Sequence, residues 1–213
     1  MRKQRGFTLI ELAIVLVIIG LLLGGVLKGQ ELINSAKVKN MGAEITSVAS
    51  AIYAYQDRFK AIPGDDAGAA AHVGGAVGTN GTAGDGTIQG AWDSTTVTHE
   101  SALVWQHLRA AGLLQGSTDT AVAASYFPTN AMAGRLGVQS VNGFTKITGM
   151  TGSFAVCSDL IPGKFVKQLD IALDDGETGT GALRAVLSTT ATGAGVATSA
   201  IVEASQYTVC MTF

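Results

Sequence analysis

The feature that most constrains this chain is an apolar run close to its N-terminus. Residues 7–27 read FTLIELAIVLVIIGLLLGGVL and carry a single charged side chain, Glu11. A helix of about 21 residues is roughly 30 Å long at 1.5 Å per residue, which matches the thickness of a bilayer hydrocarbon core. The run therefore predicts a helix that crosses a membrane.

Three basic residues precede the apolar run: Arg2, Lys3 and Arg5. By the positive-inside rule they hold the N-terminus in the cytoplasm and place the chain after Lys28 on the far side of the membrane. A secretory signal peptide has a small-residue cleavage site after its apolar stretch, and no such site follows this one. A cut between the basic leader and the apolar run would instead leave the helix on the mature protein.

The junction between leader and helix reads Arg5-Gly6-Phe7-Thr8-Leu9-Ile10-Glu11-Leu12. It resembles the junction of type IV prepilins and of the pseudopilins of type II secretion, and the resemblance covers about the first 25 residues. The short leader and the phenylalanine are more similar to the type IVa class than to the type IVb class. The resemblance implies that prepilin peptidase, a membrane aspartyl protease, removes residues 1–6 by cutting after Gly6 and methylates the new amino terminus on Phe7.

The resemblance also implies a partner for Glu11. A carboxylate in a membrane-spanning helix costs a few kcal/mol at mid-bilayer and less near the interface. Glu11 lies four residues after Phe7, on the same helix face and about 6 Å along the axis. In pilins this glutamate pairs with the terminal amine of a neighbouring subunit, here the Phe7 amine. The alternative is that Glu11 reaches toward the cytoplasmic headgroups.

After Lys28 the apolar residues become periodic and predict an amphipathic helix over residues 28–62. They recur at alternating steps of three and four residues: Val38, Met41, Ile45, Val48, Ile52, Tyr55 and Phe59. Pro63-Gly64 supplies a stop. We expect a β-sheet to cover this stripe, with a coiled coil as the alternative.

Residues 63–213 predict a globular α+β head on this long helix. Residues 61–91 hold nine glycines and eight alanines, which favours a surface loop in which Asp65-Asp66 form a solvated turn. Helices are expected over 99–114 and after Pro162. Strands are expected over 136–141 and 144–147, joined as a hairpin by Asn142-Gly143, and over 153–157 and at the C-terminus.

The two cysteines, Cys157 and Cys210, lack the spacing of a zinc or redox site. They predict one structural disulfide, provided that the head lies outside the cytoplasm. In both strands the thiol falls on the face opposite the bulky apolar residues. We therefore expect the bond on the outer side of the sheet, or between a loop and the last strand.

The remaining polar residues give no sign of catalysis. His72, His99 and His107 have no partner spacing for a metal or a nucleophile, and no phosphate-binding loop is evident. Without the leader, 11 basic side chains stand against 16 acidic ones, which argues against a nucleic-acid footprint. We therefore expect neither an enzyme nor a cofactor.

One acidic segment could gather oxygen ligands for calcium. It holds Asp170, Asp174, Asp175 and Glu177. The segment lacks the alternating ligands of an EF-hand loop, and an Asp-Gly turn is the favoured interpretation, so no metal site is assigned.

Three functions stay open at this point. The first is a structural subunit of a type IV pilus-like filament, which polymerises through residues 7–27 with identical or related pilin subunits. The second is a minor pilin or type II secretion pseudopilin. It is favoured by Lys28, which stands where many major pilins have a proline; Gly24, Gly25 and Gly29 would loosen the helix in its place. The third is a membrane-anchored periplasmic binding module that does not polymerise.

The first two functions imply the same location and partners. The subunit would reside in membrane lipid in the bacterial inner membrane, with a periplasmic head, and would then enter an extracellular pilus or a periplasmic pseudopilus. Its partners would be prepilin peptidase and the pilus or secretion assembly machinery. Adhesion, motility, DNA uptake and secretion all use the same helix, so the sequence does not choose among them.

Overall fold

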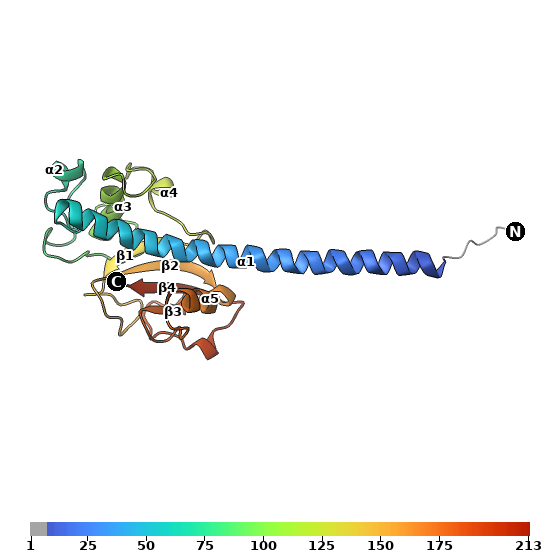
Figure 1. The fold of residues 1–213 in the computed structure, drawn as a ribbon. Coiled ribbons are helices and arrows are strands. Elements are labelled where there is room, and N and C mark those ends of the chain that lie inside the picture. Colours follow the sequence, from blue (N-terminus) through green and yellow to red (C-terminus); the bar gives the residue numbers. More distant parts are fainter. Residues whose placement is uncertain (1–7) are drawn as a thin grey trace. The chain divides into compact units, whose positions relative to one another are not determined.

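The structure, a computed structural model, describes residues 8–213 except for the side chains of residues 123 and 124. The chain divides into two compact units, Met1–Lys37 and Val38–Phe213. Both contain part of the long N-terminal helix α1 (Leu9–Phe59), drawn in blue to cyan in Figure 1.

Helix α1 lies within the predicted range of residues 7–62. It continues through Gly24, Gly25 and Gly29 without a break and ends four residues before Pro63. The buried large side chains of its second half follow the predicted stripe: Val38, Met41, Ile45, Val48, Ile52 and Tyr55. This half of α1 is therefore a core helix of the second unit.

A four-stranded antiparallel sheet covers that stripe, as expected for an α+β head. Its strands are β1 (Leu136–Ser140), β2 (Phe154–Pro162), β3 (Leu183–Leu187) and β4 (Gln206–Thr212), in the order β1-β2-β4-β3. The second half of α1 runs along one face of this sheet (Figure 1). Helix α5 (Gly163–Leu173) packs into the same core through Phe165, Val166 and Leu169. The stripe is thus covered within the chain, and no coiled coil is required.

Four shorter helices complete the unit: α2 (Ala69–Val73), α3 (Glu100–Ala110), α4 (Ala123–Tyr126) and the 3-10 helix η1 (Thr198–Ala200). Helix α3 confirms the helix predicted over 99–114, and its Trp105 and Leu108 are buried against the main core. Helix α5 confirms the one predicted after Pro162.

The disulfide joins the two central strands. Cys157 on β2 and Cys210 on β4 are direct cross-strand partners and are bonded to each other. Both are fully buried, on the sheet face opposite α1, within a second small cluster that includes Trp92. The predicted face is therefore confirmed, but that face is covered rather than exposed.

A glycine allows the cover over the disulfide. Gly137 on β1 is the register partner of Cys157, and a β-carbon at this position would overlap the main-chain oxygen of Trp92. Only glycine lets the Trp92 loop approach the strand so closely.

The hairpin predicted at Asn142-Gly143 is wrong. Strand β1 ends at Ser140 and pairs with β2, not with residues 144–147, whose only ladder contact among the described residues is an isolated bridge between Ile147 and Gly193. The Asn-Gly signal is local, whereas the partner of β1 is chosen by burial of its side chains over the whole sheet.

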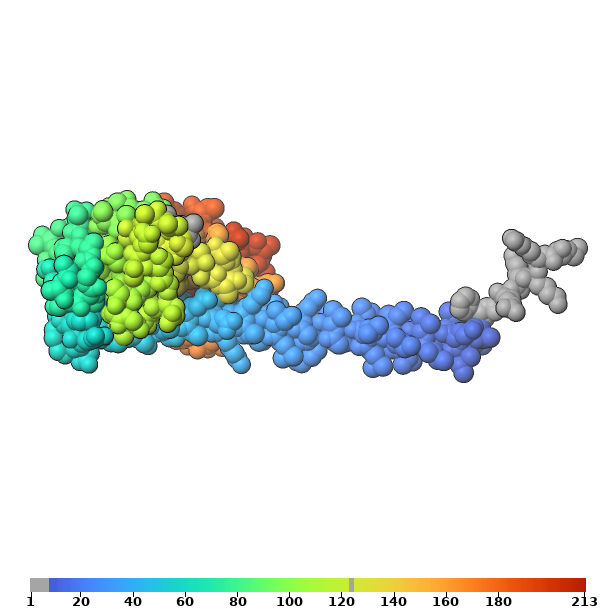
Figure 2. Space-filling model, turned by 90° about the horizontal axis from the view of Figure 1, so that it is seen from above, coloured from blue at the N-terminus to red at the C-terminus, as the bar shows by residue number. Residues whose placement is uncertain are grey.

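The surface loop predicted over 61–91 is also wrong in part. The segment contains α2, and Asp65, Asp66, Ala69 and Ile88 are all at most 2% exposed. Figure 2 shows it, in cyan to green, as part of the continuous surface beside the last turns of α1. Small residues pack here around buried carboxylates, and hydrogen bonds from the protein satisfy these carboxylates. Bulky apolar groups are therefore not needed to fill this part of the head.

We expect the disulfide to be a major source of head stability. Its cysteines are 53 residues apart, for which chain entropy gives about 4 kcal/mol, or a melting temperature lower by about 10 °C without the bond. A Cys157→Ala/Cys210→Ala chain, melted in detergent against wild type, measures this. Reductant should move wild type toward the variant; equal melting temperatures for all three samples would contradict the estimate.

Candidate functional site

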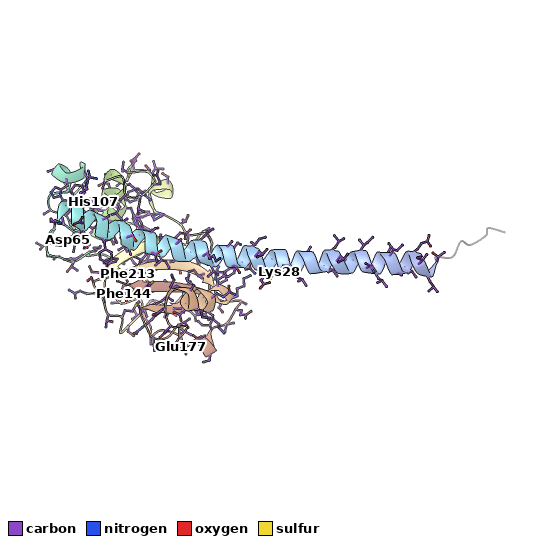
Figure 3. The ribbon with its side chains drawn as sticks, in the orientation of Figure 1. Lys28, Asp65, His107, Phe144, Glu177 and Phe213 are labelled. Atoms are coloured by element: carbon purple, nitrogen blue, oxygen red, sulfur yellow. A yellow bond between two sulfur atoms is a disulfide. The ribbon has the colours of Figure 1, made fainter. Side chains whose placement is uncertain are left out.

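The first half of α1 exposes apolar side chains in every direction. Every residue from Thr8 to Lys28 is exposed, and Figure 3 shows the side chains projecting all round this part of the helix. It is long and apolar enough to cross a membrane, and none of its most apolar window is buried. Water is a poor environment for such a surface, so the helix needs lipid or other helices around it.

Glu11 takes part in the N-terminal cap of this helix. Its Oε2 accepts a hydrogen bond from the Thr8 backbone N–H at 2.7 Å and another from the Thr8 hydroxyl at 2.8 Å. In return the Glu11 backbone N–H donates to the Thr8 hydroxyl oxygen at 3.3 Å. This is a reciprocal capping box, which satisfies amide groups that the first turn leaves without partners.

Thr8 is the residue that the sequence analysis missed. The spacing Thr8-x-x-Glu11 directly before an apolar run is itself the signature of a capping box and was sufficient to find it. Among the contacts within residues 8–213, both Thr8 donors go to Oε2 and none to Oε1. One carboxylate oxygen of Glu11 therefore remains open to a group from outside. Gly6 and Phe7, predicted as the cleavage and methylation sites, lie outside the described residues.

In the second unit, two buried aspartates organise the turn after α1. Asp65 accepts hydrogen bonds from the backbone N–H groups of Gly84, Asp85 and Gly86, the last at 2.7 Å. Asp66 accepts from the Tyr55 hydroxyl and pairs with His72 Nδ1, each at 2.7 Å. The solvated turn predicted here is wrong, because both carboxylates are buried and each accepts several hydrogen bonds from the protein.

Hydrogen bonds and burial have opposite effects on the pKa of Asp66. Burial raises the pKa of Asp66, but the hydrogen bonds from His72, Tyr55 and Gly68 outweigh it, and the net pKa is lowered. Burial, with Asp66 alongside, raises the pKa of Tyr55. Asp66 is therefore an anion that holds a neutral phenol on α1 and an imidazole on α2.

His107 on α3 is held as a neutral ring. Its Nδ1 accepts from the Gly64 N–H at 2.9 Å, so the proton is on Nε2, which donates to the Ala76 carbonyl at 2.8 Å. The ring is fully buried, and burial lowers its pKa. Figure 3 labels it beside Asp65 at the end of α1. These two bonds tie α3 to the turn after α1 and to the segment around Ala76.

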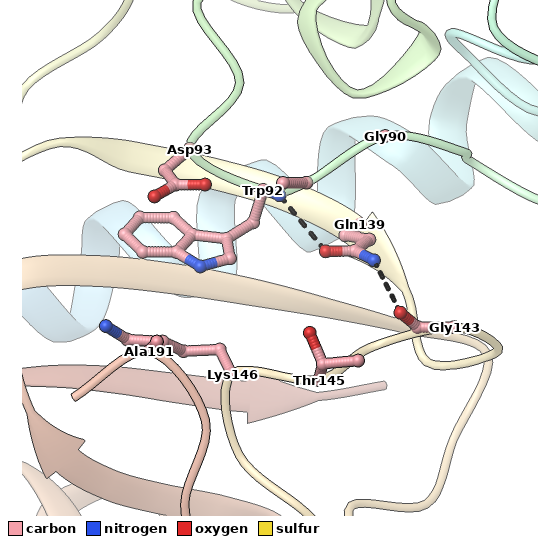
Figure 4. A pocket seen from close by; sticks show the side chains of 9 residues that line it. Gly90, Trp92, Asp93, Gln139, Gly143, Thr145, Lys146 and Ala191 are labelled. Atoms are coloured by element: carbon pink, nitrogen blue, oxygen red, sulfur yellow. Dashed lines mark hydrogen bonds between the residues drawn. The ribbon is translucent and has the colours of Figure 1, made fainter.

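One recess in the head is polar and open to solvent. It has a volume of about 460 Å³ and lies between the Trp92 loop, β1 and the loop after it. Figure 4 shows Gln139 bridging Trp92 and Gly143. The Lys146 ammonium donates to the Ser188 and Thr190 carbonyls.

The acidic segment forms a compact group at the end of α5. One carboxylate oxygen from each of Asp170, Asp174 and Asp175 lies within 4.8 Å of the other two. Glu177, the fourth residue of the segment, instead accepts from the Thr198 N–H at 2.7 Å. Burial, with the neighbouring carboxylates, raises the pKa of Asp170 to about 6.

Comparison with known proteins identifies the N-terminus. Residues 1–27 match the family described as a prokaryotic N-terminal methylation motif. The chain thus carries a leader of the type IV pilin or pseudopilin type, and leader and apolar helix together support membrane anchoring. The proteins with this motif are structural rather than catalytic. No curated protein and no solved structure matches the chain significantly.

We expect His107 to make the head less stable in mild acid. Because its folded pKa lies below its unfolded value near 6.5, the unfolded chain binds the extra proton. This contribution is intact above about pH 6.5 and is lost as pH falls, by at most about 1.4 kcal/mol per pH unit.

The measurement is the difference in unfolding free energy between pH 7.5 and pH 5.5, compared for wild type and His107→Gln. Burial also raises the pKa values of Glu44, Glu100 and Asp170, whose effect has the opposite sign, so only this difference between chains isolates His107. An identical pH dependence in both chains would show that His107 does not titrate as described.

Proposed function

We propose, from a leader of the type IV pilin or pseudopilin type, that this chain is a prepilin. In this proposal prepilin peptidase cuts after Gly6 and methylates the Phe7 amine, and the mature subunit polymerises through its N-terminal helix. The match of residues 1–27 to the methylation motif is the observation that carries the proposal.

The division of labour along α1 supports polymerisation. The main core of the head includes α1 residues only from Val38 onward. The apolar half before Lys28 contributes nothing to that core, so its surface is available to surroundings outside the chain. Lipid would cover it first, and the same helix of neighbouring subunits would cover it after assembly.

The cut would create the charge that Glu11 requires. A methylated Phe7 amine stays positive, and in a bundle of apolar helices a carboxylate and an ammonium from adjacent subunits would neutralise each other. Because the capping bonds use Oε2, Oε1 of Glu11 is the atom on which the neighbouring amine would dock. The pair would fix the axial register between subunits.

The direction of insertion follows from the leader charges. Arg2, Lys3 and Arg5 would remain in the cytoplasm, and the head would lie in the periplasm before it enters a filament. The Cys157–Cys210 bond supports this direction, since disulfides persist outside the reducing cytoplasm.

A minor pilin or pseudopilin is the second candidate. Lys28 occupies the position of the proline found in many major pilins, and α1 runs unbroken through it. Such a subunit would share the processing and the helix but would prime or cap a short filament. A membrane-anchored binding module that never polymerises would keep its leader.

The Glu11 charge can be separated from its capping role. Glu11→Gln keeps the cap and Glu11→Val loses it, but both remove the charge. Because breaking a buried ion pair costs about 3–5 kcal/mol, both should reduce filament yield by at least roughly tenfold. Thr8→Ala loses the cap, worth about 1 kcal/mol, but keeps the charge and should assemble nearly normally.

Yield is measured as sheared filaments from a bacterium that expresses the chain with its assembly machinery. Membrane-inserted, cleaved subunit is quantified in parallel, because all three variants should retain it. Normal yield with Glu11→Gln would assign Glu11 to capping alone.

Processing itself predicts a defined mass. The mature chain should begin at Phe7, carry one N-methyl group and retain the disulfide, as intact mass spectrometry can measure. Gly6→Val, which puts bulk at the cut, should leave the leader attached. An unprocessed wild-type N-terminus would favour the anchored module, whereas the share of this chain in purified filaments separates major from minor subunit.

A further inference from the structure

A small recess of about 170 Å³ lies between the second half of α1 and helix α3. Helix α1 contributes Glu44, Ser47 and Val48 to its lining, and α3 contributes Trp105 and Arg109. Two loops and the first residue of β1 complete the walls. All of these residues belong to the second unit, so the recess is independent of the leader and of the apolar half of α1.

Glu44, on the α1 side of the recess, has a carboxylate oxygen without a partner. Its Oε2 is shielded from solvent and accepts no hydrogen bond from any described residue. Burial raises the pKa of the Glu44 carboxyl, although a hydrogen bond from the Ala131 backbone lowers it in part. A shielded carboxylate oxygen is costly to leave unpaired, so the recess favours a hydrogen-bond donor that the chain does not supply.

Arg109 brings the opposite charge to the same recess. Its Nε donates to the Gln115 carbonyl at 3.2 Å, and its Nη1 donates to the carbonyls of Ser117 and Tyr126. These bonds fix the guanidinium in place, and no hydrogen bond among the described residues uses Nη2. The salt bridges among these residues include neither Arg109 nor Glu44. The recess therefore presents a negative and a positive group that do not pair directly.

The remaining walls are largely apolar. Val48, Trp105 and Leu136 are each at most 5% exposed, and they form the inner side of the recess. A volume of about 170 Å³ corresponds to roughly six water molecules and lies below the roughly 300–1,000 Å³ of sites for drug-sized ligands. The recess thus suits a small molecule that combines two opposite charges with a short hydrocarbon part.

We propose that this recess binds a small zwitterion, an α-amino acid with an apolar side chain. Its ammonium group would donate to Glu44, its carboxylate would accept from Nη2 of Arg109, and its side chain would contact Trp105. A guanidinium fixed by other bonds is well suited to hold a carboxylate. An amine alone would leave Arg109 unused, and an anion alone would be repelled by Glu44. This binding function goes beyond the proposed filament function and requires neither leader cleavage nor polymerisation.

The test uses the full chain in detergent micelles and L-leucine as the probe. Titration calorimetry should give one leucine per chain with a Kd of about 1 mM or below, as expected for a ligand of about nine non-hydrogen atoms. The fluorescence of Trp105, which lines the recess, should change in parallel. Leucinamide lacks the carboxylate and N-acetylleucine lacks the ammonium, so each should bind at least about tenfold more weakly.

Three variants connect this binding to the recess. Glu44→Gln keeps the shape of the side chain but removes its charge, and should weaken leucine binding at least about tenfold. Ser47→Leu places bulk in the recess from an exposed position and should abolish binding. Ser50→Leu is the matched control, because Ser50 is exposed on the same helix and bonds back to the main chain as Ser47 does, but lies outside the recess. It should bind as wild type does.

Melting curves check that the variants are folded. No saturable leucine signal up to about 10 mM would show that water alone fills the recess, and would overturn the proposal. Wild-type affinity in both Glu44→Gln and Ser47→Leu would also overturn it, and so would equal affinity for leucine and its two derivatives. None of these outcomes bears on filament assembly, because the unassembled chain is measured.

Discussion

About twenty consecutive residues at the start of α1 are not covered by any other described part of the chain, and this constrains the rest of the structure. Because the helix from Thr8 to Lys28 is exposed on every side, it contributes nothing to the fold of the head. The head must therefore close its own core, and it does so from Val38 onward with a sheet, α3 and α5. One continuous helix thus serves two environments, with the transition between them marked by a change in pattern from uniform to periodic.

The parts of the fold that follow from periodicity were predictable. The stripe from Val38 to Tyr55 states which face of α1 is buried, and the structure agrees. The alternation in β4 identifies the face that joins the main core, although the opposite face is buried as well. Errors arose where a local signal met a non-local constraint. Asn142-Gly143 has hairpin chemistry, but β1 finds its partner in β2 across a longer loop. Segment 61–91 lacks bulky residues, and hydropathy cannot reveal that Asp65 and Asp66 are buried behind backbone amides.

The candidate sites likewise differ in how far the sequence alone could reveal them. The leader junction and Glu11 are contiguous in sequence, so a short pattern was enough to single them out, and the Thr8-x-x-Glu11 cap was equally readable. Asp170 was visible as one acid among four, but its distinction from Glu177 is three-dimensional. Asp170 is buried without a hydrogen-bond partner among the residues that the structure describes, while Glu177 accepts a hydrogen bond from the Thr198 amide. Spacing alone carries no information about which carboxylate the fold leaves uncompensated.

The position of the disulfide also has a mechanical meaning. Cys157 and Cys210 lie on the two central strands of the sheet. Their bond closes a loop of the chain that contains α5 and β3. A tensile force applied to the chain outside this loop cannot draw out the 53-residue span between the two cysteines, even after the sheet has separated. At the reach of an extended backbone, roughly 180 Å of contour length is thereby withheld from extension. Under load the head therefore extends less than the full length of its chain would allow.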